Sequence, residues 1–145
     1  MKPNELKIGN IVHCYDEDRI VSGLNNPFNN SNWDVELKDM KRDLFTTAEI
    51  EDLIPIQLTE EWLLKFGSTS NDFIHSDKTI TKDLFLFGSL GVQLIDGTWV
   101  LCKIPGKHIN YDLIYLKEIK YVHQLQNLYF ALTEKELTWR DTQNN

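Results

Sequence analysis

Six side chains of the types that bind metal ions or act as nucleophiles are scattered along the 145-residue chain: His13, Cys14, His75, Cys102, His108 and His123. Zinc sites are recognised in a sequence by cysteines and histidines separated by roughly two to five residues. None of the six follows that pattern, and the neighbours His13 and Cys14 would point to opposite faces of a strand. The sequence therefore predicts no metal site and no cofactor.

Nucleophilic catalysis needs a cysteine or serine within reach of a histidine that a third group orients. Cys102 and His108 lie on either side of a Pro-Gly turn, which could bring them together. However, a lone cysteine in the apolar stretch "WVLCKI" is typical of a small buried residue. The acidic run Asp16–Asp18 is predicted to be a solvated hairpin tip, with no flanking apolar pocket to raise a carboxyl pKa. We therefore predict a protein without catalytic residues, and an enzyme is the third hypothesis.

Basic character is concentrated between Leu101 and Leu125, which is formally +2 while the rest of the chain is -9. Lysines bind phosphates, aromatic rings stack on bases and amides read base edges. This segment and the two amides after it therefore predict a site for a nucleotide-type ligand. The predicted ligand-binding residues are Lys103, Lys107, His108, Tyr111, Lys120, His123, Gln126 and Asn127.

The stretch "YVHQLQNLYFAL" has the period of a helix. Its predicted core stripe comprises Ile119, Val122, Leu125, Tyr129 and Leu132. A second face carries His123, Gln126, Asn127 and Phe130, with Lys120 near it. That face could be the wall of a pocket, a protein interface or an ordinary solvated helix surface. Phe130 favours an interface with a partner or a second subunit, because a large apolar side chain is expected to be exposed there.

Composition limits the function classes. Hydrophobic residues make up 41% and charged residues 26%, as in ordinary soluble globular proteins. The net charge of -7 argues against general binding to nucleic acid, which depends on basic residues. The chain shows no signal-peptide pattern, no paired-cysteine spacing and no apolar run near the roughly 18 residues of a membrane span. We expect a cytoplasmic, reduced protein without membrane association.

The fold is predicted to be α+β, with two lobes packed as one compact unit. Residues 1–57 contain a predicted hairpin around Asp16–Asp18, a loop over residues 25–32 and the alternating strand "WDVEL". One more strand, a helical turn and a last strand ending near Pro55 follow. This series of five short strands resembles a small SH3-like β-barrel, a fold that serves many functions.

Residues 58–145 are predicted to form an α+β lobe. Thr59 can cap a helix over residues 60–66, and Gly67 can end it in the left-handed conformation. Apolar stretches between residues 71 and 116 predict antiparallel strands, with a hairpin at Asp96-Gly97. A longer helix is predicted over residues 118–133.

Three blocks of sequence, "NELKIGN", "IPIQLTEEWLLKFG" and "IKYVHQLQNLYFALTEKEL", resemble a family of small proteins common in gut anaerobes, their prophages and mobile elements. The resemblance implies a compact accessory protein of phage type and assigns no catalytic residues. The segment from Ser68 to Asn110 matches none of the blocks.

These patterns lead to two functional hypotheses. The first is a non-enzymatic binding protein, a counter-defence factor that sequesters a nucleotide signal or masks a host protein, acting as an oligomer through Phe130. The second is an accessory nucleoprotein or protein-assembly module that acts through the SH3-like lobe.

Overall fold

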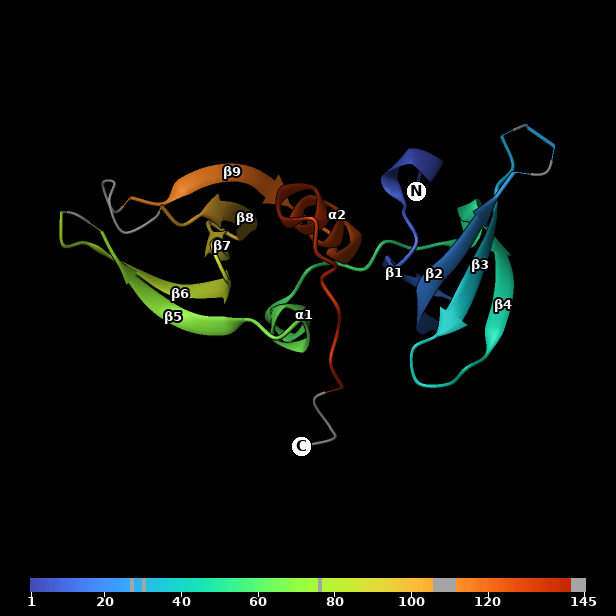
Figure 1. The fold of residues 1–145 in the computed structure, drawn as a ribbon, viewed down its shortest axis with the longest axis horizontal. Helices are drawn as coiled ribbons and strands as arrows, with labels where there is room; N and C mark the ends of the chain where they lie inside the picture. The colour runs from blue at the N-terminus through green and yellow to red at the C-terminus, as the bar shows by residue number, and fades with distance from the viewer. Residues whose placement is uncertain (27, 30, 76, 106–111, 142–145) are drawn as a thin grey trace. The chain divides into compact units, whose positions relative to one another are not determined.

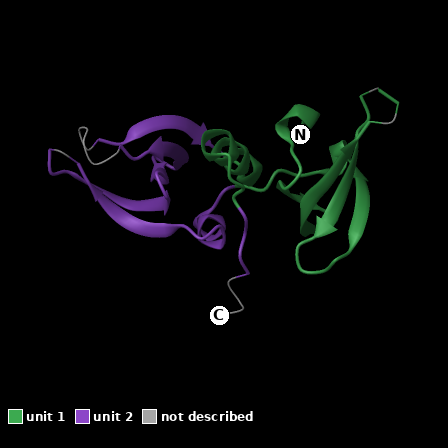
Figure 2. Ribbon diagram, viewed as in Figure 1, with its two compact units in different colours: residues 1–57, 121–137 green, residues 58–120, 138–145 purple. Residues whose placement is uncertain are grey.

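A computed structural model describes residues 1–26, 28–29, 31–75, 77–105 and 112–141 (Figure 1). The protein is α+β, with two antiparallel sheets and few helices, which confirms the α+β part of the predicted fold. The chain divides into two compact units (Figure 2). The first comprises residues 1–57 and 121–137, and the second comprises residues 58–120 and 138–145. The long helix α2 (Val122–Thr133), predicted as part of the second lobe, belongs to the first unit.

The first unit contains a four-stranded meander in the order β1-β2-β3-β4. Its strands are β1 (Ile11–Cys14), β2 (Glu17–Asn25), β3 (Asp34–Asp39) and β4 (Phe45–Glu49). The predicted hairpin is present, and its two-residue turn is Tyr15-Asp16, with φ values of 52° and 62°. Positive φ at both turn residues gives the twist that matches the flanking strands.

After β4 the chain forms a 3-10 turn, η2 (Ile50–Asp52), and returns to β1. The backbone groups of His13 and Ile54 exchange hydrogen bonds of 3.0 and 2.9 Å. The pairing of these two residues is an isolated bridge and does not extend into a strand. In the described part of the chain no barrel is closed.

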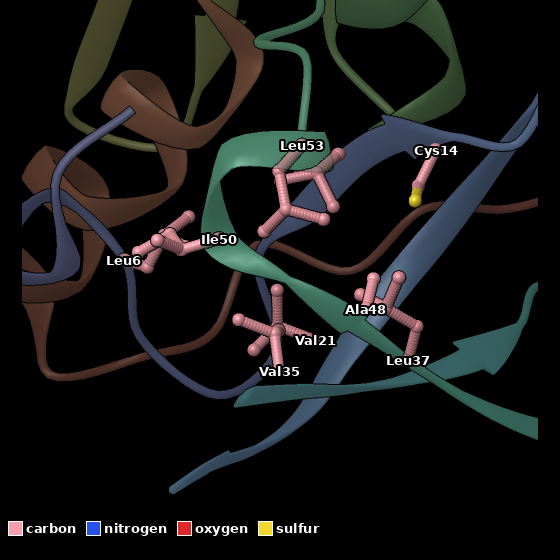
Figure 3. Packing of buried hydrophobic residues seen from close by; sticks show 9 residues of the cluster. Leu6, Cys14, Val21, Val35, Leu37, Ala48, Ile50 and Leu53 are labelled. Carbon is pink, nitrogen blue, oxygen red and sulfur yellow. The ribbon is translucent and has the colours of Figure 1, made fainter. Parts of the chain in front are cut away.

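The core of the first unit lies between the sheet, η2 and the 3-10 turn η1 (Pro3–Glu5) with the residue after it (Figure 3). In β3 the inward residues Val35 and Leu37 alternate with outward Asp34 and Glu36, as expected of a half-buried strand. The buried cluster comprises Leu6, Val12, Cys14, Val21, Val35, Leu37, Ala48, Ile50 and Leu53. Full burial of each large aliphatic side chain contributes about 1.5–3 kcal/mol.

The second unit begins with helix α1 (Glu60–Lys65). The hydroxyl of Thr59 accepts a hydrogen bond from the amide of Trp62 at 3.4 Å, and Gly67 has a φ of +80°. Both predicted end signals are therefore confirmed. The helix ends one residue before the predicted Phe66, which has left the helical conformation.

A five-stranded antiparallel meander follows in the order β5-β6-β7-β8-β9. Its strands are β5 (Thr69–Ile74), β6 (Ile80–Phe87), β7 (Leu90–Ile95), β8 (Thr98–Lys103) and β9 (Ile114–Ile119). The predicted Asp96-Gly97 hairpin is present, with positive φ at both residues. Gly91 allows close packing, because a Cβ there would lie 3.0 Å from Leu84 and 3.4 Å from the sulfur of Cys102.

The predicted start of the long helix at residue 118 is wrong, because β9 continues to Ile119 and α2 begins at Val122. Extended backbone is favoured here by hydrogen bonds to a distant segment. In the second unit, the backbone amide of Leu58 donates a hydrogen bond of 2.9 Å to the carbonyl of Lys120. In the first unit, the backbone amide of Val122 donates a hydrogen bond of 2.9 Å to the carbonyl of Ile56.

The predicted faces of α2 also need correction. Val122 and Leu125 are buried as expected, but Leu132 is 52% exposed. His123 and Gln126, assigned to the face away from the core, are buried. Of the helices in the described ranges, none has the length and apolar character needed to cross a membrane.

Candidate functional site

The side chain of Gln126 serves as a hydrogen-bonding partner for the chain just before β1. Its Oε1 accepts a hydrogen bond from the amide of Ile11 at 2.9 Å, and its Nε2 donates to the carbonyl of Gly9 at 3.0 Å. One amide thus satisfies two backbone groups two residues apart, as a neighbouring strand would. Together with Ile54, which pairs with His13, it covers the outer edge of β1.

Asn127 extends this set of contacts. Its Oδ1 accepts from Nδ2 of Asn10 at 2.9 Å, and its Nδ2 donates to the carbonyl of Glu5 at 2.8 Å. Asn10 is fully buried, and its Oδ1 accepts a hydrogen bond from the amide of Lys7 at 2.8 Å. We call the four hydrogen bonds that Gln126 and Asn127 make to residues 5–11 the amide clamp. Each such bond contributes about 0.5–1.5 kcal/mol to stability.

One turn further along α2, Phe130 is 41% exposed and is held by Lys7. The ammonium of Lys7 lies 4.3 Å from the centroid of the Phe130 ring and pairs with Glu136, with Nζ–Oε distances of 2.6 and 2.7 Å. A cation–π contact at such an exposed position contributes about 0.5–1 kcal/mol. Ile8, the next residue, is 61% exposed. We call Lys7, Ile8, Phe130 and Glu136 the Phe130 surface.

His123 lies one turn before the clamp and is buried. Its ring stacks on that of Tyr121, with centroids 5.8 Å apart and planes 10° from parallel. Nδ1 has no hydrogen-bond partner among the described residues. Burial lowers the pKa of His123, the Glu5 carboxylate acts in the opposite direction, and the charged amino terminus adds to the lowering. Burial therefore favours the neutral form of the imidazole.

The predicted ligand-binding residues are divided between the two units. Lys103 and Lys120 are exposed and belong to the second unit, at β8 and just after β9. His123, Gln126 and Asn127 belong to the first unit. Lys107, His108 and Tyr111 lie outside the described residues. The amides of Gln126 and Asn127, which were expected to face a ligand, instead bind residues 5–11 of the protein itself.

The net charge is also unevenly divided. The first unit has 7 basic and 13 acidic side chains, a net charge of -6, and the second has 8 basic and 9 acidic ones, a net charge of -1. The Phe130 surface therefore belongs to an acidic unit, which disfavours a phosphate-rich partner there.

His108, the expected partner of Cys102, lies outside the described residues, so only the surroundings of Cys102 are described. Cys102 is fully buried, and its Sγ lies 3.3 Å from the carbonyl oxygen of Gly91. Burial raises the pKa of this thiol to about 11. A nucleophilic cysteine requires the thiolate, so Cys102 is a packing residue at neutral pH.

A cluster that the sequence reading missed joins β6 to the residue after β5. His75 Nε2 lies 2.6 Å from the hydroxyl oxygen of Thr81, and its Nδ1 lies 3.6 Å from a carboxylate oxygen of Asp112. Hydroxyl, imidazole and carboxylate follow the order of a hydrolase triad. However, Thr81 is buried, and the distance to Asp112 exceeds that of a hydrogen bond. The contact closes a hairpin, because Ile74 pairs with Ile80 beside it.

The short apolar stretches on either side of the turn "SDKT" are the sequence signal for the hairpin that brings His75 and Thr81 together. In the described ranges no group of three or more His, Cys, Asp and Glu side chains is arranged to hold a metal ion.

Comparison of the chain with protein-family models, with curated proteins and with solved structures finds no match.

Proposed function

We propose that the protein is a non-enzymatic binding protein that recognises another protein through the Phe130 surface. The observation that carries this proposal is the state of Phe130, a large aromatic ring that is exposed and yet fixed by Lys7. Aromatic side chains that are ordered before binding lose little conformational entropy in an interface and often contribute much of its binding energy.

A protein partner is favoured over a nucleotide by the hydrogen bonds of α2. Gln126 uses both its oxygen and its nitrogen within the first unit, and it is only 2% exposed. His123 is buried beside it. The groups left at the surface are the apolar side chains of Ile8 and Phe130 with a Lys7–Glu136 ion pair, which is the composition of a protein interface with a polar rim.

The test compares proteins captured by the wild type, by Phe130→Asp and by Phe28→Ser, each immobilised in equal amount. Phe28 is 80% exposed in the β2–β3 loop and serves as the matched control for loss of a surface phenylalanine. We expect one partner to be retained by the wild type and by Phe28→Ser, and to fall at least tenfold with Phe130→Asp. Equal recovery by all three proteins would exclude the Phe130 surface.

A second candidate is a protein-assembly module that acts through an SH3-like first sheet. It is favoured by the return of the chain from β4 to β1, where His13 and Ile54 pair, and by the exposure of Tyr15 and Phe45 on neighbouring hairpins. In that case Tyr15→Ala or Phe45→Ser would abolish capture of the partner, and Phe130→Asp would not.

A further inference from the structure

The Phe130 surface is assembled from two segments that are far apart in the sequence. Phe130 and Glu136 come from α2 and the residues after it, whereas Lys7 and Ile8 come from the N-terminal segment, residues 1–11. The surface therefore exists only while this segment lies against α2.

A single stripe of α2 holds the segment. His123, Gln126, Asn127 and Phe130 are spaced by three, four and seven residues from the first, so they share one side of the helix. Gln126 and Asn127 hold residues 5–11 by the amide clamp, and Phe130 contacts Lys7.

His123 is the first residue of this stripe and lies at the N-terminal end of α2. It is 3% exposed, and the described residues offer no acceptor to its Nδ1. Two charged groups act on the ring from the N-terminal segment, the carboxylate of Glu5 and the amino group of Met1, and Tyr121, the residue before α2, stacks on it. The Glu5 carboxylate also accepts a hydrogen bond from the amide of Lys2 at 2.9 Å, so it is engaged within η1. A second proton on the ring would therefore add a buried charge without a dedicated partner.

We propose that the N-terminal segment and α2 form a latch that opens when His123 is protonated, and that opening takes the Phe130 surface apart. Opening exposes the imidazole to water, where the charged form is stable. Acid therefore favours the open state, because the open state binds the proton more tightly than the closed one. The role given to the surface rests on the proposed function, but the opening itself does not.

The experiment follows the amide of Ile11, the side-chain amide of Gln126 and the ring of His123 by NMR between pH 7.5 and 5. We expect exchange of the Ile11 amide, corrected for its intrinsic pH dependence, to rise by up to about tenfold per pH unit below about 6.5. The Gln126 resonances should change over the same range in which the ring titrates. Titration of the ring without a change at Ile11 and Gln126 would overturn the proposal.

Three variants separate the latch from other acid effects. His123→Phe keeps an aromatic ring against Tyr121 and should keep Ile11 protected at pH 5. His13→Gln removes a half-buried histidine of the same unit, which pairs with Asp18 at 2.9 Å, and should retain the wild-type pH response. Gln126→Ala should leave Ile11 unprotected already at pH 7.5. An unchanged pH response in His123→Phe would contradict the proposal, and the wild-type titration decides the matter if that variant does not fold.

Failure of the latch and failure of the proposed function give different results. If the latch is wrong, the Ile11 amide stays protected in acid while Phe130→Asp still loses its partner. If the Phe130 surface binds nothing, the pH response of Ile11 is unaffected, because it is measured on the protein alone.

Discussion

Gln126 and Ile11 are joined by a hydrogen bond of 2.9 Å although 115 positions separate them in the sequence. The bond lies at the edge of β1, where an unpaired amide would otherwise face α2. Through this bond, a polar side chain of α2 takes the place of a neighbouring strand at the edge of the first unit's sheet. The stability of that unit should therefore depend on an amide that the sequence presents as a helix-surface residue.

We expect Gln126→Leu to destabilise the protein by about 1–3 kcal/mol, because the buried amide of Ile11 and carbonyl of Gly9 lose their partner. Urea unfolding of the wild type and the variant measures the difference. Gln57→Leu is the control, since the Gln57 side chain is exposed, and it should change stability by less than about 0.5 kcal/mol. Equal urea midpoints for the wild type and Gln126→Leu would show that water can replace the two hydrogen bonds that Gln126 makes.

Asp39 organises the β3–β4 hairpin. Hydrogen bonds from the Arg42 side chain, at 2.6 and 3.2 Å, and from the amide of Lys41 hold the pKa of its carboxyl well below the usual range. Because the folded-state pKa is lowered, the carboxylate stabilises the fold above its unfolded value of about 3.9 and loses that effect in stronger acid. Asp39→Asn should therefore lower the melting temperature at pH 7, and the difference from the wild type should narrow below pH 4. A difference that stays constant with pH would contradict this reading.

Gly91→Ala should destabilise the second unit by about 1–3 kcal/mol, since the new methyl group would overlap Leu84 and approach Cys102. Leu84→Val makes room on the same side of the sheet. The double variant should therefore be less destabilised than the sum of the single changes, as denaturant unfolding of all four proteins will measure. If the losses in free energy of unfolding add, the contact with Leu84 is not the cause of the destabilisation.

Both cysteines should resist thiol reagents in the folded protein. Burial raises the pKa of Cys14 and that of Cys102, the latter to about 11, and both side chains are buried. At pH 8 we expect slow labelling of the native protein and stoichiometric labelling of two thiols in denaturant. Rapid labelling of Cys102 in native protein would restore it as a candidate nucleophile.

Local signals in the sequence were sufficient for the turns and for the short helix. Thr59 caps α1 by its own side chain, and Asp96-Gly97 adopts the backbone that its residue types favour. The start of α2 could not be read in this way. It depends on backbone hydrogen bonds of Lys120 and Val122 to the segment around Gln57, more than 60 positions earlier.

The candidate site shows a second limit. A helical glutamine or asparagine is compatible with solvent, a ligand or a buried backbone partner, and only the position of residues 5–11 decides among them. The exposure of Phe130 was predictable from its position beside polar residues on the helix face away from the predicted core stripe. Its contact with Lys7 was not, since nothing local links them.

The division of the chain has a consequence for biosynthesis. The larger part of the second unit, residues 58–120, is inserted in the first, between the segment that contains its sheet, residues 1–57, and the segment that contains α2, residues 121–137. During translation, 63 residues are synthesised after the sheet segment and before α2, which takes about 3–13 s at about 5–20 residues per second. Until α2 emerges from the ribosome, the amides before β1 lack the clamp, and the edge of the nascent sheet is open to chaperones or to another nascent chain.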